Sequence, residues 1–187
     1  MNSVDISSSN FTSLSCIGNT SVKTIKIVSD NLNSVVVNKC TKLQSITVSG
    51  KVLEVLNLSE CSNLTEVNIL GPKDSITTLN LYGTKVATIK YNSVEPNSEG
   101  IMDLSIFKTI GNFNIAANSA VQYIQFTNDS LKPIIITNPF TSCTSLQRVY
   151  GHLDIRCSSV FYGCRNFSIH GSDIETAKYL NKSIINA

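Results

Sequence analysis

The chain has 187 residues and a net charge of +2, and only 15% of its residues are charged, against about 25% in an ordinary domain. Uncharged polar residues replace the missing charges, with 20 Asn, 26 Ser and 16 Thr. The hydrophobic share of 42% is enough to bury a core and argues against disorder. No Lys/Arg cluster indicates nucleic-acid binding, and no apolar run approaches the roughly 18 residues of a membrane span.

The first ten residues, MNSVDISSSN, are polar and lack the apolar stretch of a signal peptide. We expect an irregular N-terminal segment over residues 1–10, followed by a repeat that begins by Phe11. No capping element precedes that repeat, so its strand edges would be open. The N-terminal coil is therefore a candidate for end-to-end self-association.

An apolar pattern recurs from Phe11 onward at intervals of 20 to 25 residues. Each unit reads apolar-x-x-apolar-x-apolar-x-x, followed in most units by Cys, Asn or Thr, and the units begin at Phe11, Leu32, Leu53, Ile76, Ile101 and Val121. A second series with the same spacing begins at Val22, Leu43, Leu64, Val86, Ile110 and Leu131. Two series with matching intervals indicate a solenoid in which each coil buries its apolar edge against its neighbours.

The apolar-x-apolar end of each unit has a period of two, which predicts a short strand with one buried face. In the first series this places a strand at Leu104 and Ile106, with Phe107 pointing outward. The stretch 92–100, NSVEPNSEG, is predicted to be a surface loop. We expect a further strand at Tyr150–Ile155.

Two segments carry a resemblance to a known family. Residues 53–64, LEVLNLSECSNL, and 32–43, LNSVVVNKCTKL, are similar to the leucine-rich-repeat consensus LxxLxLxxCxxL. The bacterial BspA-like variant is similar to the later part of the chain, at Phe140, Cys143, Leu146 and then Phe161, Cys164, Phe167. Over residues 11–170 the resemblance implies a β-rich, right-handed solenoid of about seven coils, with a parallel sheet on one or both faces.

The final segment, residues 171–187, has the pattern of a short helix. Asp173 is a candidate N-cap, and Ile174, Ala177, Leu180 and Ile184 form one apolar stripe. We expect this helix to cap the last coil. A partner-binding helix is the alternative.

Six cysteines are present, without a CxxC motif or a His cluster beside them, so no metal site or cofactor is expected. Cys40, Cys61, Cys143 and Cys164 share one inward position of the repeat. We expect small buried side chains with weak hydrogen bonds to loop backbone. A disulfide and a reactive thiol are the alternatives.

The sequence favours no catalytic site. His152, Asp154, Cys157 and Ser158 include the residue types of a hydrolase triad, but nearness in sequence does not place them together in space. No phosphate-binding loop, HExxH or GxSxG is present. We therefore expect a protein that is not an enzyme.

One set of predicted outward residues is a candidate contact patch for a partner: Asn80, Tyr82, Phe107, Tyr123 and Gln125. Aromatic side chains are enriched at binding hot spots. The alternative is that these aromatics are scattered and have no role in binding.

The resemblance implies a binding module that recognises a protein or glycan, within a bacterial surface or secreted protein with a role in adhesion. The other interpretation is a structural or assembly component, such as a fragment of a larger adhesin or a virion protein, with a cytoplasmic or virion location.

Overall fold

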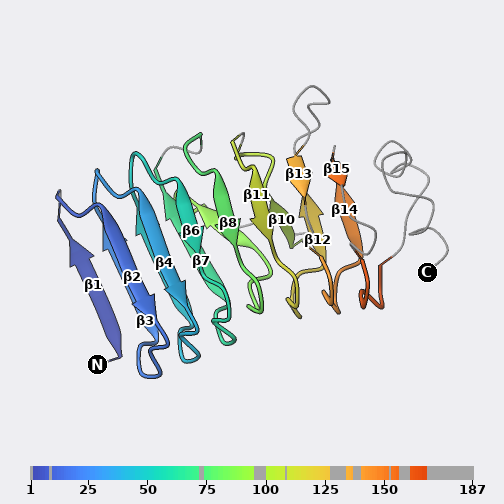
Figure 1. Ribbon diagram of the computed structural model, residues 1–187, viewed down its shortest axis with the longest axis horizontal. Helices are drawn as coiled ribbons and strands as arrows, with labels where there is room; N and C mark the ends of the chain where they lie inside the picture. The colour runs from blue at the N-terminus through green and yellow to red at the C-terminus, as the bar shows by residue number, and fades with distance from the viewer. Residues whose placement is uncertain are drawn as a thin grey trace.

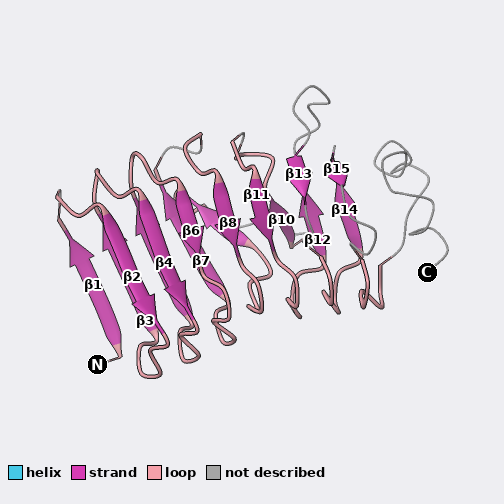
Figure 2. Cartoon of the chain, viewed as in Figure 1, coloured by secondary structure: helices cyan, strands magenta, loops and turns pink. Residues whose placement is uncertain are grey.

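The computed structural model describes residues 2–8, 10–71, 74–94, 100–107, 109–126, 134–136, 140–151, 153–155 and 161–167. Within these ranges the chain forms short strands joined by turns and loops, and it contains no helix (Figure 2). The strands stack along one long axis as a parallel β-solenoid of about 6 turns (Figure 1). The predicted solenoid is confirmed.

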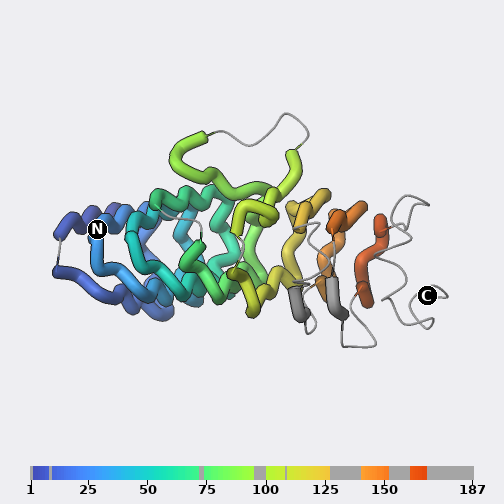
Figure 3. Tube along the Cα trace, turned by 90° about the horizontal axis from the view of Figure 1, so that it is seen from above, coloured from blue at the N-terminus to red at the C-terminus, as the bar shows by residue number. Residues whose placement is uncertain are grey.

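Two five-stranded parallel sheets form most of the molecule. Sheet 1 contains β1 (Ser3–Ser7), β3 (Thr24–Val28), β5 (Ser45–Ser49), β7 (Glu66–Leu70) and β9 (Ile89–Tyr91). Sheet 2 contains β2 (Ser13–Ile17), β4 (Ser34–Asn38), β6 (Val55–Asn57), β8 (Thr78–Asn80) and β11 (Asn112–Asn114). From β1 to β9 the chain alternates between these sheets, so the trace runs as two rows when seen from above (Figure 3).

Two smaller parallel sheets continue the solenoid. Sheet 3 contains β10 (Ile101–Asp103), β12 (Tyr123–Gln125) and β14 (Arg148–Tyr150), and sheet 4 pairs β13 (Ile134–Ile136) with β15 (Leu153–Ile155). Strand β13 contacts β11, so sheet 4 extends the line of sheet 2. The rings of Phe113 on β11 and Phe126 after β12 meet edge to face with centroids 5.5 Å apart. Sheet 3 therefore faces the layer of β11 across the core.

The core follows directly from the alternation of side chains along each strand. On β4, Val35 and Val37 are fully buried, whereas Ser34, Val36 and Asn38 are half-buried on the outer face. The same alternation recurs one coil later, where Leu56 and Leu58 are fully buried. Parallel, in-register pairing stacks these inward side chains on one another, which confirms the predicted period-two core.

A residue with left-handed backbone closes the coils at one corner. The corner residues share a φ between 56° and 80° and are Gly18, Lys39, Glu60, Gly83, Ala117, Ser142 and Gly163. The corner N–H donates to a carbonyl of the next coil, for example from Glu60 to Tyr82 at 2.7 Å. A non-glycine residue in this conformation costs roughly 1–2 kcal/mol. The stacked hydrogen bonds offset that cost.

From the second corner onward, the residue after each corner points inward and forms a column through the solenoid. Its members are Cys40, Cys61, Thr84, Asn118, Cys143 and Cys164, whereas Asn19, after the first corner, is exposed. The sequence analysis identified the cysteines of this column but not Asn118, whose side chain is fully buried.

The N-terminal segment differs from the expectation. Residues 3–7 form the regular strand β1, which pairs in register with β3, so an irregular segment over 1–10 is wrong for these residues. Val4 and Ile6 alternate with polar residues and pack against the core, which gives this strand the pattern of the later ones. The outer edge of β1 has no neighbouring strand in the described part of the chain.

The predicted order of the two series is wrong after residues 92–100. Asn112 on β11 pairs with Thr78 on β8, although the sequence analysis assigned these strands to different series. The chain passes from β9 directly into β10, which starts another sheet. On either side of residues 95–99 the described chain leaves the line of the coil (green in Figure 3). Strand β10 is therefore an extra strand between β9 and β11. After it, β11 lies in the layer of sheet 2 and β12 lies in the opposite layer, so the alternation between layers is shifted by one strand.

The strand predicted at Leu104 and Ile106 is displaced for a local reason. Strand β10 covers 101–103, and Asp103 Oδ1 then accepts hydrogen bonds from the Ser105 backbone N–H at 2.9 Å and its hydroxyl at 2.5 Å. This turn ends the strand and directs Phe107 inward, where it is 1% exposed. The expectation that Phe107 is exposed is therefore wrong.

The strand predicted at Tyr150–Ile155 is two strands in different sheets. Strand β14 ends at Tyr150, and β15 begins at Leu153. Gly151, with φ of 102°, turns the chain between them. The helix predicted over 171–187 lies outside the described residues.

Candidate functional site

The structure separates the residues of the predicted contact patch. Asn80 lies on β8 and Tyr82 follows it, on the outer face of sheet 2. Tyr123 and Gln125 lie on β12 in sheet 3, in the opposite layer. Phe107 lies in the core. These residues do not form one surface, so Asn80 and Tyr82 are the members that can act together.

The polar groups of Tyr123 and Gln125 bond to their own surroundings. The Tyr123 hydroxyl donates to Gln147 Oε1 at 3.0 Å. The Gln125 side-chain amide donates to the Phe126 carbonyl at 2.6 Å. Both residues are half-buried. The Tyr123 bond joins β12 to the residue that precedes β14, and both bonds leave those donors less available to a partner.

Sheet 2 presents a different polar arrangement, a row of asparagines across three neighbouring strands. The row, which we call the amide row, consists of Asn57 on β6, Asn80 on β8 and Asn114 on β11. The strand register places Asn57 beside Asn80 and Asn80 beside Asn114. Neighbouring strands are about 4.8 Å apart, so the amide row repeats at that interval along the solenoid axis.

Each amide of the row is oriented by a turn that follows its strand. The Oδ1 atoms of Asn57, Asn80 and Asn114 accept hydrogen bonds from the backbone N–H two residues later, at 3.1, 3.0 and 3.0 Å. An amide oxygen that accepts from a backbone N–H fixes which end of the side chain is the nitrogen. The Nδ2 donors of the three residues have no partner among the residues that the structure describes.

A shallow hollow of about 170 Å³ lies at one end of the amide row, between β8 and β11. Its lining consists of Thr78, Leu79, Asn80, Gly111, Asn112, Phe113 and Asn114. Apart from the backbone, the polar groups offered to this hollow are one hydroxyl and three amides. Tyr82, two residues beyond Asn80, is 40% exposed.

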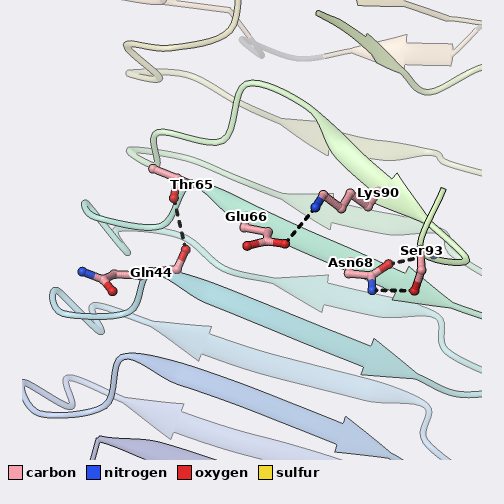
Figure 4. A network of polar contacts seen from close by, with 6 residues as sticks. All are labelled: Gln44, Thr65, Glu66, Asn68, Lys90 and Ser93. Atoms are coloured by element: carbon pink, nitrogen blue, oxygen red, sulfur yellow. Dashed lines mark hydrogen bonds and ion pairs between the residues drawn. The ribbon is translucent and has the colours of Figure 1, made fainter. Parts of the chain in front are cut away.

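The outer face of sheet 1 contrasts with the amide row because its polar side chains bond to one another (Figure 4). The Lys90 ammonium lies 3.1 Å from a Glu66 carboxylate oxygen. Asn68 donates to the Ser93 hydroxyl and accepts from the Ser93 N–H, both at 3.2 Å. These contacts join β7 to β9 and the turn that follows it, which is a structural role.

Only part of the amide row was predicted from the sequence. The repeat pattern predicts that Asn57 and Asn80 lie on the outer face. Because residues 110–115 were assigned to the other series, Asn112 and Asn114 were not predicted to lie beside them. The signal was present in the sequence: VLNLS, TLNLY and NFNIA, which begin at residues 55, 78 and 112, share an apolar-Asn-apolar triplet.

Cys40, Cys61 and Cys143 are the small buried side chains that we expected, whereas Cys164 is half-buried. The thiol of Cys61 lies 3.2 Å from the Val37 carbonyl oxygen and that of Cys143 lies 3.1 Å from the Ile115 carbonyl oxygen, so each donates to an earlier coil. Burial raises the pKa of the Cys61 thiol to about 12. A buried thiol with a raised pKa is a poor nucleophile at neutral pH.

Two thiols of the first coils lie close to one another. The Sγ atoms of Cys16 and Cys40 lie 3.7 Å apart, and both cysteines are free thiols. Burial, and then the neighbouring Cys40 thiol, raise the pKa of Cys16. This pair lies in the first coils, away from the amide row.

No metal-binding cluster emerges from the described ranges. Among those residues, no group of three His, Cys, Asp or Glu side chains is placed to hold a metal ion. His152, Cys157 and Ser158 lie outside the described residues, and only the backbone of Asp154 is described. In the described part of the chain, no helix is long and apolar enough to cross a membrane.

Comparisons with protein families, with curated proteins and with solved structures find no match for this chain. The amide row and the adjoining hollow are therefore interpreted from their own chemistry.

Proposed function

We propose that this protein is a non-catalytic binding module of the leucine-rich-repeat type that recognises a protein or glycan partner through the outer face of sheet 2. The observation that supports the proposal is the amide row, whose oriented donors border a hollow and lie near the exposed ring of Tyr82. Polar groups that converge on a concave surface are typical of binding sites. The leucine-rich-repeat resemblance implies the same role, within a bacterial surface or secreted protein.

The proposal is tested with the purified protein on arrays of glycans and of extracellular-matrix proteins. A retained ligand should be lost when Asn80 and Tyr82 are both replaced by alanine. Tyr123→Ala, on the opposite layer, is the matched control and should retain the ligand. A ligand that Tyr123→Ala releases, and that the Asn80/Tyr82 variant keeps, would assign binding to sheet 3 instead.

A structural or assembly role is the second candidate, and the open end of the solenoid favours it. Val4 and Ile6 on β1 are only partly buried, whereas the equivalent Ile25 and Ile27 on β3 are 1% and 0% exposed. Ile17 at the end of β2 is 64% exposed. An unpaired strand edge with partly exposed apolar residues is a template for another chain.

Sedimentation velocity at increasing protein concentration tests this second role. End-to-end assembly predicts a concentration-dependent dimer or longer species that Ile6→Lys, on the open edge, reduces. Thr47→Glu on β5, which is separated from the open edge by β3, should leave assembly unchanged. A monomer at all concentrations would contradict self-assembly through this end.

A further inference from the structure

The amide row is a set of preoriented hydrogen-bond donors. Each Oδ1 atom is occupied by a backbone N–H, so the group that each side chain leaves for a ligand is its NH₂. The three residues are half-buried, and their nitrogens are not among the buried polar atoms that lack a partner in the described chain. Solvent reaches these nitrogens, so a ligand can reach them too.

The geometry of the row suits an extended ligand that crosses the strands. The donors repeat at about 4.8 Å, the spacing of parallel strands, along the axis of the solenoid. This interval is close to the length of one sugar unit in an extended glycan chain. A peptide strand laid across β6, β8 and β11 would offer its carbonyls on one edge at about twice the rise per residue, near 6.6 Å, and would not match the row.

The hollow between β8 and β11 seats one unit of such a ligand. Its volume of about 170 Å³ is below the roughly 300–1,000 Å³ of pockets that enclose a whole small molecule. Thr78 and Asn112 add a hydroxyl and a further amide beside Asn80 and Asn114. Tyr82 follows Asn80 by two residues and is 40% exposed, and a tyrosine combines an apolar ring with a polar hydroxyl.

Charge indicates which class of glycan fits. None of the residues that line the hollow is charged, and the amide row is neutral. Sulfated or uronate chains are recognised through Arg and Lys, which this lining lacks. Neutral donors match the oxygens of sugar hydroxyls and ring ethers.

From these observations we infer that the amide row and its hollow bind a linear, neutral oligosaccharide that lies along the solenoid axis across β6, β8 and β11. The inference rests on the proposed binding function and specifies its ligand. Asn57, Asn80 and Asn114 donate hydrogen bonds to successive sugar units, and Tyr82 packs against the unit near the hollow.

Serine substitutions in the amide row should remove the hydrogen-bond donor to the ligand while they keep the turn that follows each strand. A serine hydroxyl still accepts the hydrogen bond of the turn, although more weakly, and it is too short to reach the ligand. Ser15 on β2 already occupies the equivalent position of sheet 2, next to Val36 in the register. Aspartate also supports this turn, as Asp103 does, but it would offer sugar hydroxyls a new acceptor. Asn68→Ser on sheet 1 is the matched control.

Isothermal titration calorimetry with cellohexaose, xylohexaose and mannohexaose measures the binding. We expect at least one hexasaccharide to bind, about tenfold weaker in Asn80→Ser and in Asn114→Ser and roughly a hundredfold weaker in the double variant, as expected for one lost hydrogen bond per site. Asn68→Ser should bind as the unmodified protein does. Circular dichroism melts check that each variant is folded.

The failures of this inference and of the proposed function are distinguishable. The inference is overturned if none of the three hexasaccharides binds, or if the Asn80/Asn114 double variant binds as tightly as the unmodified protein. If no hexasaccharide binds but an array protein is retained in a Tyr82-dependent manner, the glycan inference is wrong and the binding function stands. If an anionic probe such as hexagalacturonate binds better than the neutral sugars, the assignment to neutral glycans is wrong.

Discussion

The two ends of the solenoid build the same coil from different side chains. In the part from β1 to β9, the core is a stack of Ile, Val, Leu and Cys. Strands of three residues occur in both parts, and from β8 onward every described strand has this length. From β10 onward the core also contains a chain of contacting phenylalanines: Phe113, Phe126, Phe140, Phe161 and Phe167. The left-handed corner and the inward column continue through both parts. The repeat therefore depends on its corner and its alternation more than on strand length or side-chain type.

The aromatic part should lose the most stability from a single truncation. Phe140 is fully buried and contacts the rings of Phe113, Phe126 and Phe161. Phe140→Ala should cost about 3–5 kcal/mol of unfolding free energy, because it removes a large side chain and leaves a cavity. Urea denaturation measures the loss.

Hydrogen exchange separates the two parts in the same variant. In a solenoid each coil contacts only its neighbours, so Phe140→Ala should lower protection in β12 and β14 and leave β3 and β5 protected. Leu56→Ala, with an expected cost of about 2–5 kcal/mol, should affect β4 to β8 instead. Equal loss of protection along the whole chain would show that the two parts unfold as one unit.

The inward column contains cysteines in the part from β1 to β9 and the hydrogen-bonded Asn118 in the later part, so substitutions in the column should distinguish the two parts. Asn118 donates to the Val86 carbonyl at 2.9 Å and accepts from the backbone N–H groups of Ala120 and Val121 at 2.8 and 2.9 Å. Asn118→Cys, which copies the earlier coils, should cost about 3 kcal/mol because buried backbone groups lose partners. A chemical-denaturation midpoint equal to that of the unmodified protein would show that the column residues are interchangeable.

The alkaline limit of stability should depend on the cysteine column. The pKa of Cys61 is raised to about 12 in the folded protein, whereas an unfolded thiol ionises near 8.5. Above that lower value the unfolded chain releases a proton that the folded chain keeps, so stability falls as pH rises toward 12. The slope for one such thiol is about 1.4 kcal/mol per pH unit.

Thermal melts from pH 8 to 11 measure this effect. Cys61→Thr, which introduces the residue found at position 84 of the same column, should reduce the slope. The stability of the two proteins should converge as pH rises. An unchanged slope in Cys61→Thr would mean that other groups control alkaline unfolding.

Substitutions at the left-handed corner should change the stability least. We expect a loss of stability at Gly83 in the first part and a small gain or no change at Ala117 in the later part. Gly83 has a φ of 67°, and a Cβ there would meet nothing closer than 3.7 Å, the distance to Glu60 Cα. Gly83→Ala should therefore cost only the backbone penalty of about 1 kcal/mol. Ala117 holds the same conformation at φ of 57°, so Ala117→Gly should raise the melting temperature slightly or leave it unchanged. Differential scanning calorimetry detects both shifts.

The sequence by itself determined the solenoid, because apolar residues two apart that recur every 20 to 25 residues are buried most simply by stacking coils on one another. It also determined the inward cysteines and the outward positions of Asn57 and Asn80. It did not reveal that β1 is a strand, since five residues of SVDIS carry too few apolar positions to form a series.

The tertiary structure alone decided which strands lie side by side beyond residue 92. Strand β10 is an extra strand between β9 and β11, so the strands that follow it lie in the layer opposite to the one predicted. No local sequence pattern indicates this change of layer. That change separates Tyr123 from Tyr82 and brings Asn114 beside Asn80. The candidate site exists because pairing between distant strands, and not sequence spacing, determines which outward side chains become neighbours.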